Sequence, residues 1–81
     1  MIDVEFTCVE DDMIQFECTD VDGRVYGVGD TIIGGEIEDT IVIDMETLDE
    51  VEDSELFKRI VTARTVFMCE SYAVQEALKE L

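Results

Sequence analysis

Carboxylates are the main side chains of this chain that could do chemistry. Its 81 residues include 22 Asp or Glu and five Lys or Arg, and histidine is absent. Without histidine, a serine or cysteine nucleophile has no imidazole to activate it. Two carboxylates can share acid and base roles only where their environments separate their pKa values. The acids here occupy polar, solvent-facing positions of the sequence pattern, so we expect no enzymatic activity.

One acidic segment, Asp20–Gly23, resembles a fragment of a calcium-binding loop, in which alternating carboxylates precede a glycine. When Gly23 is aligned with the glycine of such a loop, Cys18 falls at the first ligand position and Gly29 at the last. The last position needs a bidentate Glu, so the pattern fails at both ends. A hairpin turn at Asp22-Gly23 is the better interpretation.

The three cysteines, Cys8, Cys18 and Cys69, do not have the spacing of a zinc site and have no histidine to join them. Their odd number argues against a disulfide framework and for a reducing compartment, so we expect a cytoplasmic protein. Neither a secretory signal pattern nor a membrane-spanning apolar stretch is recognisable. We therefore expect no metal, no cofactor and no contact with a membrane.

The net charge of −17 is segregated along the chain. Residues 1–57 hold nineteen acids and one base, Arg24, whereas residues 58–81 hold three acids and four bases. Such a chain is repelled by nucleic acids and anionic membranes and attracted to basic surfaces. Adaptation to high salt would acidify every exposed face, including the nearly neutral C-terminal part. The segregation therefore favours a specific basic partner over salt adaptation.

Apolar and polar residues alternate over residues 2–9 and again over residues 13–19, which predicts two half-buried strands. A three-residue loop, Glu10-Asp11-Asp12, keeps their apolar faces in phase and places Phe6 opposite Phe16. We expect these two strands to form an antiparallel hairpin.

A second hairpin follows, with Val21-Asp22-Gly23 as its loop and a third strand over about Arg24–Val28. It places Cys18 opposite Tyr26. Residues 30–36 are predicted to be a flexible connection or irregular strand. The fourth strand covers about Ile37–Met45. Its inward residues are predicted to be Ile41, Ile43 and Met45, and its outward residues Glu38, Thr40, Val42 and Asp44.

The remainder of the chain has helical periodicity. Residues 47–50 fit a capping box, and Asp53-Ser54 offers a second N-cap. No Pro or Gly interrupts Ser54–Glu80. A straight helix of that length spans about 40 Å, whereas a strand of eight residues spans about 26 Å. Three alternatives follow: the helix overhangs the sheet, breaks in two, or packs on another copy as a homodimer.

The predicted fold is a single α+β domain over 1–81: a four-stranded antiparallel sheet with a long C-terminal helix packed on one face. Residues 1–46 form the acidic sheet and residues 47–81 the helical segment. A second apolar stripe on the helix is a candidate surface for a dimer or a partner. Its members are Phe57, Val61, Met68 and Tyr72.

The open face of the sheet and its loops are predicted to carry the partner-binding carboxylates. Alternate residues on a strand lie about 6.7 Å apart and neighbouring strands about 4.8 Å apart. Carboxylates on this lattice approach the charge density of a nucleic-acid duplex, about one charge per 1.7 Å of axis. The candidate residues are Asp3, Glu5, Glu10, Asp11, Asp12, Glu17, Asp20, Asp22, Asp30, Glu36, Glu38, Asp39 and Asp44.

In its acidic set from Asp3 to Glu55, displayed on a small domain without catalytic residues, the chain resembles phage-encoded inhibitors that act as DNA mimics. These are the anti-CRISPR and anti-restriction proteins. The resemblance implies a non-enzymatic inhibitor that blocks the basic DNA- or RNA-binding groove of a host defence complex in the host cytoplasm. It also implies no direct binding to nucleic acid.

The alternative is an acidic adaptor or assembly protein that binds a basic partner through the apolar helix stripe. Binding that depends on the stripe rather than on Glu38 and Asp44 would indicate the adaptor. Competition with nucleic acid for the partner would indicate the mimic.

Overall fold

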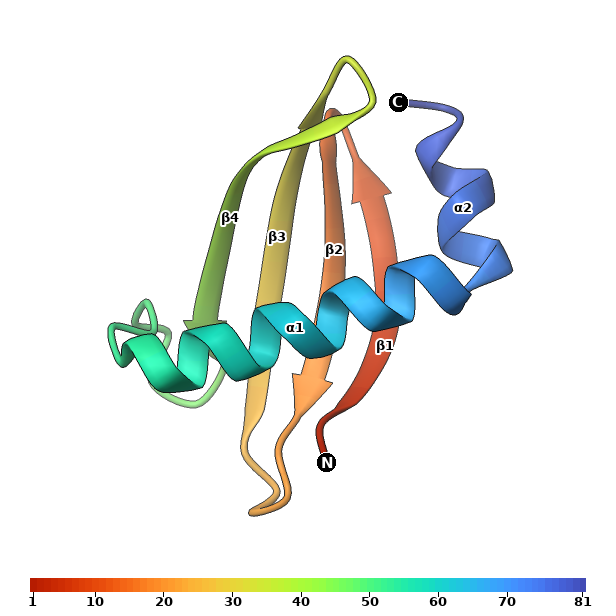
Figure 1. Cartoon of the computed structure of the whole chain (residues 1–81). Helices are drawn as coiled ribbons and strands as arrows, with labels where there is room; N and C mark the ends of the chain where they lie inside the picture. The colour runs from red at the N-terminus through yellow and green to blue at the C-terminus, as the bar shows by residue number, and fades with distance from the viewer.

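The computed structural model describes residues 1–81 as a four-stranded sheet followed by two helices. Every pair of neighbouring strands is antiparallel, and the spatial order follows the chain order. The first helix crosses one face of the sheet, and the second turns away beside the first strand (Figure 1). Neither helix is long and apolar enough to cross a membrane. The elements are β1 (Asp3–Glu10), β2 (Met13–Thr19), β3 (Val25–Ile33), β4 (Glu36–Asp44), α1 (Ser54–Glu70) and α2 (Tyr72–Leu78).

The β1–β2 hairpin has the predicted pairing of Phe6 with Phe16 but not the predicted loop. Glu10 pairs with Met13, so the turn contains two residues rather than three, and Asp11 has a positive φ of 56°. A register shift between Phe6 and Cys8 takes up the difference. An extra residue in one strand restores the phase of the two apolar faces, which a two-residue turn alone would break.

The β2–β3 hairpin confirms the turn predicted at Asp22-Gly23. Gly23 has a φ of 85°, and its N–H donates to the carbonyl oxygen of Asp20 at 2.9 Å. The Asp22 carboxylate accepts a hydrogen bond from the backbone N–H of Arg24 at 2.9 Å. Cys18 pairs with Tyr26 as predicted. The segment that resembles a calcium loop is therefore a hydrogen-bonded hairpin turn.

The β3–β4 connection is a tight turn, so the prediction of an irregular segment over residues 30–36 is wrong. β3 continues to Ile33, β4 begins at Glu36, and these two residues pair. Gly34 and Gly35 have φ angles of 63° and 81°. Two consecutive positive φ angles are typical of the turns that best fit the twist of a hairpin, and glycine adopts them without strain.

The predicted orientation of β4 is reversed. Val42 is buried opposite Val28, and Asp44 is also buried on this helix-covered side. Ile41 and Ile43 instead lie on the uncovered face. A shift of one residue moves every side chain of a strand to the opposite face. Both sets of alternate residues in β4 contain apolar side chains, so the sequence pattern alone did not determine the phase.

The core lies between the sheet and the helices. Phe16 is at its centre, 6.1 Å from the ring of Phe6 and 6.1 Å from the ring of Phe67 on α1, the latter in an edge-to-face arrangement. The ten buried apolar residues are Ile14, Phe16, Cys18, Tyr26, Val28, Ile32, Val42, Ile60, Met68 and Val74.

The helical segment breaks in two, which confirms one of the three predicted alternatives. Ser71 is extended, with φ −92° and ψ 116°, and its hydroxyl accepts a hydrogen bond from the N–H of Val74 at 3.3 Å. A serine in this conformation is a preferred N-cap, so it both ends α1 and starts α2. Asp53 caps α1 by accepting from two backbone N–H groups. The alternative capping box at residues 47–50 does not start a helix.

Candidate binding surface

Three aspartates are buried, and each is paired with one of the three arginines. These three residues were predicted to belong to the exposed partner-binding set, but the structure buries them and satisfies their charges inside the molecule. The pairs are Asp20–Arg59 at 3.1 Å, Asp30–Arg64 at 3.2 Å and Asp44–Arg24 at 3.0 Å.

The pair Asp30–Arg64 is the most deeply buried, with side-chain exposures of 0% and 5%. Arg64 Nε and Asp30 Oδ2 lie close together but are not aligned as a hydrogen bond. Thr40 connects them: its hydroxyl donates to Asp30 Oδ1 at 2.6 Å and accepts from Arg64 at 3.3 Å. Burial raises the pKa of Asp30, while the Thr40 hydrogen bond and the Arg64 charge act to lower it. This network ties α1 to the middle of the sheet.

The pair Asp20–Arg59 ties α1 to the β2–β3 turn. The Asp20 carboxylate accepts from the backbone N–H of Val21 at 2.8 Å and from the Arg59 guanidinium. These hydrogen bonds, that of Val21 first, lower the pKa of Asp20. The third pair, Arg24–Asp44, joins the ends of β3 and β4 and leaves Arg24 half exposed.

The other ten predicted partner-binding acids are exposed, and none has an ion pair. Outside the three buried pairs, the only ion pair joins Lys79 to Glu76. Asp3, Glu5 and Glu17 lie on the uncovered face of the sheet, with Glu5 directly opposite Glu17. The others are Glu10, Asp11, Asp12, Asp22, Glu36, Glu38 and Asp39.

Exposed acids are also found at the end of the sheet that carries two of its turns, and in the segment between β4 and α1. The β1–β2 and β3–β4 turns, with Glu10–Asp12 and Glu36, lie at the same end (Figure 1). A further acidic group was not among the predicted site residues. It follows β4 and starts α1, and consists of Glu46, Asp49, Glu50, Glu52, Asp53 and Glu55.

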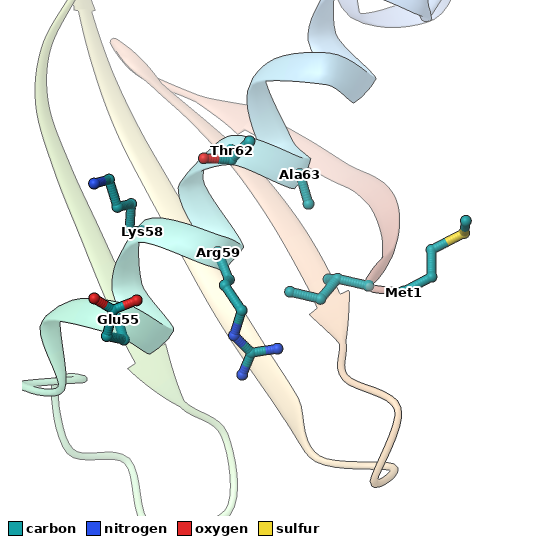
Figure 2. A pocket seen from close by; sticks show the side chains of 7 residues that line it. Met1, Glu55, Lys58, Arg59, Thr62 and Ala63 are labelled. Carbon is teal, nitrogen blue, oxygen red and sulfur yellow. The ribbon is translucent and has the colours of Figure 1, made fainter.

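The bases gather on the helix side. Lys58 and Arg59 of α1 line a shallow pocket of about 510 Å³ together with Met1 and Thr62 (Figure 2). Lys58 makes no ion pair. Unpaired carboxylates thus surround the sheet and the start of α1, where Glu55 lines the same pocket as Lys58.

The uncovered face of the sheet also contains an apolar groove that the sequence interpretation missed. Its volume is about 400 Å³, and its floor includes Gly27 and Gly29 of β3. We call it the sheet groove. Met45 and Leu48 at its rim are 47% and 71% exposed. Glycine inside a strand often marks a close approach by another group, and this was the available signal. The apolar residues that line the open side are Met13, Ile41, Ile43, Met45 and Leu48.

The predicted helix stripe is not one exposed surface. Met68 is only 8% exposed, and Phe57 and Val61 are half-buried against the core. Tyr72, at 79% exposure, is the only member that faces solvent freely. A partner surface made of these four side chains is therefore not present in this conformation.

The chemistry of the surface is that of carboxylates and apolar contact. No group of three or more Cys, Asp or Glu is arranged to hold a metal ion. Burial raises the pKa of the Cys18 thiol to about 11, which disfavours its thiolate. No protein-family model matches the chain, and no curated protein or solved structure was found to be similar to it.

Proposed function

We propose that this protein is a non-enzymatic inhibitor that covers the basic nucleic-acid-binding surface of another protein. One observation supports the proposal above the others: all three arginines are held by buried aspartates. The exposed carboxylates of the sheet and its turns are consequently left without an internal counter-charge, and they can act together on an external cationic surface.

The spacing of the carboxylates suits this role. Glu5 and Glu17 are direct cross-strand neighbours on the uncovered face, and Asp3 lies two residues along the same strand. Such neighbours lie about 5 Å apart across strands and about 6.7 Å apart along a strand. Like charges placed opposite each other destabilise a sheet. Their presence on one face is therefore better explained by binding than by folding.

The target class follows from this surface. A groove lined with Lys and Arg for DNA or RNA would meet a fixed array of negative charges, and long-range attraction would speed the encounter. The resemblance to DNA-mimic inhibitors implies that the target is a nuclease or a CRISPR surveillance complex in the cytoplasm, which has such a groove. The protein itself would not bind nucleic acid, because both carry negative charge.

Competition is the direct test. The immobilised protein is incubated with a cell lysate at low salt, and the retained proteins are eluted with a DNA duplex or an RNA. Each eluted protein is then titrated with a labelled duplex in the presence of the chain. We expect the chain to displace the duplex, and its affinity to fall steeply between about 50 and 200 mM salt.

Matched charge variants locate the binding surface. The triple variant D3N/E5Q/E17Q removes three charges from the uncovered face, and E70Q/E76Q/E80Q removes three from the helices. We expect the first to weaken displacement about tenfold or more and the second to have a much smaller effect, because only the first set faces the groove of the target. Equal losses would mean that net charge alone matters.

A second candidate function is an acidic adaptor that holds a basic partner without blocking its nucleic acid. The sheet groove favours it, since apolar contact there could anchor a partner region outside its nucleic-acid site. A ternary complex of chain, partner and duplex, detected by size-exclusion chromatography, would exclude the inhibitor and support the adaptor.

A further inference from the structure

The sheet groove lies open on the face opposite α1. Its floor carries no side chain at Gly27 and Gly29 of β3. Ile43 and Ile41 of β4 are the cross-strand neighbours of these two glycines and form one wall. Solvent-exposed Leu48 extends that wall beyond the strand. The result is a shallow apolar depression within the most acidic region of the chain.

Two methionines border this depression and lie over its floor. A Cβ built on Gly27 would lie 2.9 Å from the sulfur of Met45, and one on Gly29 would lie 3.1 Å from the sulfur of Met13. The thioether side chain is unbranched and flexible, and methionines are frequent in surfaces that adapt to a bound partner. Displacing the two side chains outward would deepen the depression down to the backbone of β3.

Charge determines what can enter. Glu17 lines the groove and has Glu5 directly opposite on β1. A second copy of the chain would bring a like surface and a net charge of −17 against this one. That approach is repulsive, as is the approach of an anionic lipid surface. A segment with Lys or Arg beside its apolar residues would be attracted.

We propose that the sheet groove binds an amphipathic helix whose apolar stripe is flanked by Lys or Arg, and that this helix belongs to the protein whose basic surface the carboxylates cover. The inference rests on the proposed function and names the partner element. The groove lies on the face of the sheet, where an added strand would find no backbone groups to pair with. A helix satisfies its own backbone and presents apolar residues at i, i+3, i+4 and i+7. α1 packs on the opposite face of the same sheet in this manner.

The groove and the carboxylates then have separate tasks. Charge attracts many basic surfaces and is weakened by salt, whereas desolvated apolar contacts near the centre of an interface select one partner. A protein with carboxylates alone would bind basic proteins with little discrimination. The sheet groove supplies the contact that distinguishes them.

The test uses two synthetic peptides of the same leucine and lysine composition. One places its leucines on a single helical face, and the other distributes them around the helix. Binding is measured by calorimetry at 0.5 M salt, and the methyl groups of Met and Ile are followed by NMR. We expect the first peptide to bind about tenfold or more tightly than the second, as for the burial of one or two apolar side chains. The methyl signals of Met13, Ile41, Ile43 and Met45 should shift.

Variants make the test specific. M45Q/L48S changes two exposed groove residues and should remove the preference for the first peptide. V66S changes a half-exposed apolar residue on α1 and should leave the preference unchanged. Circular dichroism confirms that both variants are folded. Equal affinities of the two peptides for the unmodified protein, or shifts centred on α1, would overturn the inference. A dimer that buries this face in sedimentation experiments would also overturn it.

The two proposals can fail separately. If the peptide preference is present but no captured partner is displaced from nucleic acid, the proposed inhibitor function is wrong. The proposal that the groove binds an amphipathic helix is then still supported. If displacement occurs but M45Q/L48S displaces as well as the unmodified protein, the carboxylates act alone and the groove proposal is wrong.

Discussion

The two faces of the sheet are built from the same four strands but differ in whether their charged and apolar side chains are buried or exposed to solvent. On the face covered by α1, Ile14, Phe16 and Val42 are buried, and the pair Asp30–Arg64 lies among them. On the other face, apolar side chains surround glycines and remain in contact with solvent beside unpaired carboxylates. The covered face buries its apolar and charged side chains, whereas the open face leaves both kinds in contact with solvent.

The two faces also differ in whether their carboxylates are paired with arginines. Two of the three arginines, Arg59 and Arg64, come from α1 and bind buried aspartates of β2–β3. The helix thus supplies the cation for two of the three buried aspartates, and Arg24 supplies it for Asp44. The exposed carboxylates of the sheet keep their negative charge because all three arginines are paired with buried aspartates.

The largest expected effect comes from breaking the central pair. Arg64→Met leaves Asp30 buried without its cation, which should lower the free energy of unfolding by about 3–5 kcal/mol in urea titrations. Arg24→Met is the control, because its partner Asp44 is nearer to solvent, and it should be milder. Adding Asp30→Asn to the Arg64 variant should recover part of the loss. Equal losses for the two arginines would contradict the special role of the covered face.

A second prediction compares neighbours in sequence that lie on opposite faces. Ile14→Ala opens a cavity in the core and should lower the unfolding free energy by about 2–5 kcal/mol. Met13→Ala removes a half-buried side chain from the sheet groove and should lower it by less than about 1 kcal/mol. Thermal and urea unfolding of the two variants measure the difference. Similar losses would mean that the open face is packed as a second core.

The smallest expected effect is a difference in pH dependence between Asp20 and Asp30. Asp20 has a lowered pKa, so its stabilisation is present above the ordinary value of 3.8 and is lost as pH falls through the folded value. Asp30 has a raised pKa, so its contribution is largest below 3.8 and decreases as pH rises through the folded value. Melting of D20N and D30N beside the unmodified protein, from pH 3 to 7, measures both.

The loss of stability in each variant, relative to the unmodified protein, should therefore change with pH in opposite ways. That of D20N should grow as pH rises, and that of D30N should shrink. Parallel slopes for the two variants would show that both carboxylates titrate in similar surroundings, and the contrast between an edge pair and a central pair would fail.

The local features of the fold could be predicted from the sequence. Short-range alternation and turn residues determine the β1–β2 and β2–β3 pairing, including Phe6 opposite Phe16 and Cys18 opposite Tyr26. The Asp53 N-cap is equally local. The Gly34-Gly35 turn was available as a hairpin signal of the same kind but was interpreted as a flexible segment.

The features that depend on tertiary contact could not be predicted. The orientation of β4 follows from which of two apolar patterns the helix covers, and on the covered side Arg64 contacts both Asp30 of β3 and Thr40 of β4. Arg64 is 24 positions from Thr40 and still farther from Asp30, so no local pattern indicates that it pairs with them. The exposed carboxylates were identified, except for the three that arginines bury. The sheet groove was missed because Ile41 and Ile43 were assigned to the core.

The placement of the amines on the helix side has a practical consequence. Lys58 is an exposed residue of α1, and Lys79 follows α2. They are the two lysines in the sequence. Attachment of a dye or a solid support to the lysine amines would therefore occur away from the open face. Such a conjugate presents the carboxylates and the sheet groove outward, in the orientation that a binding assay needs.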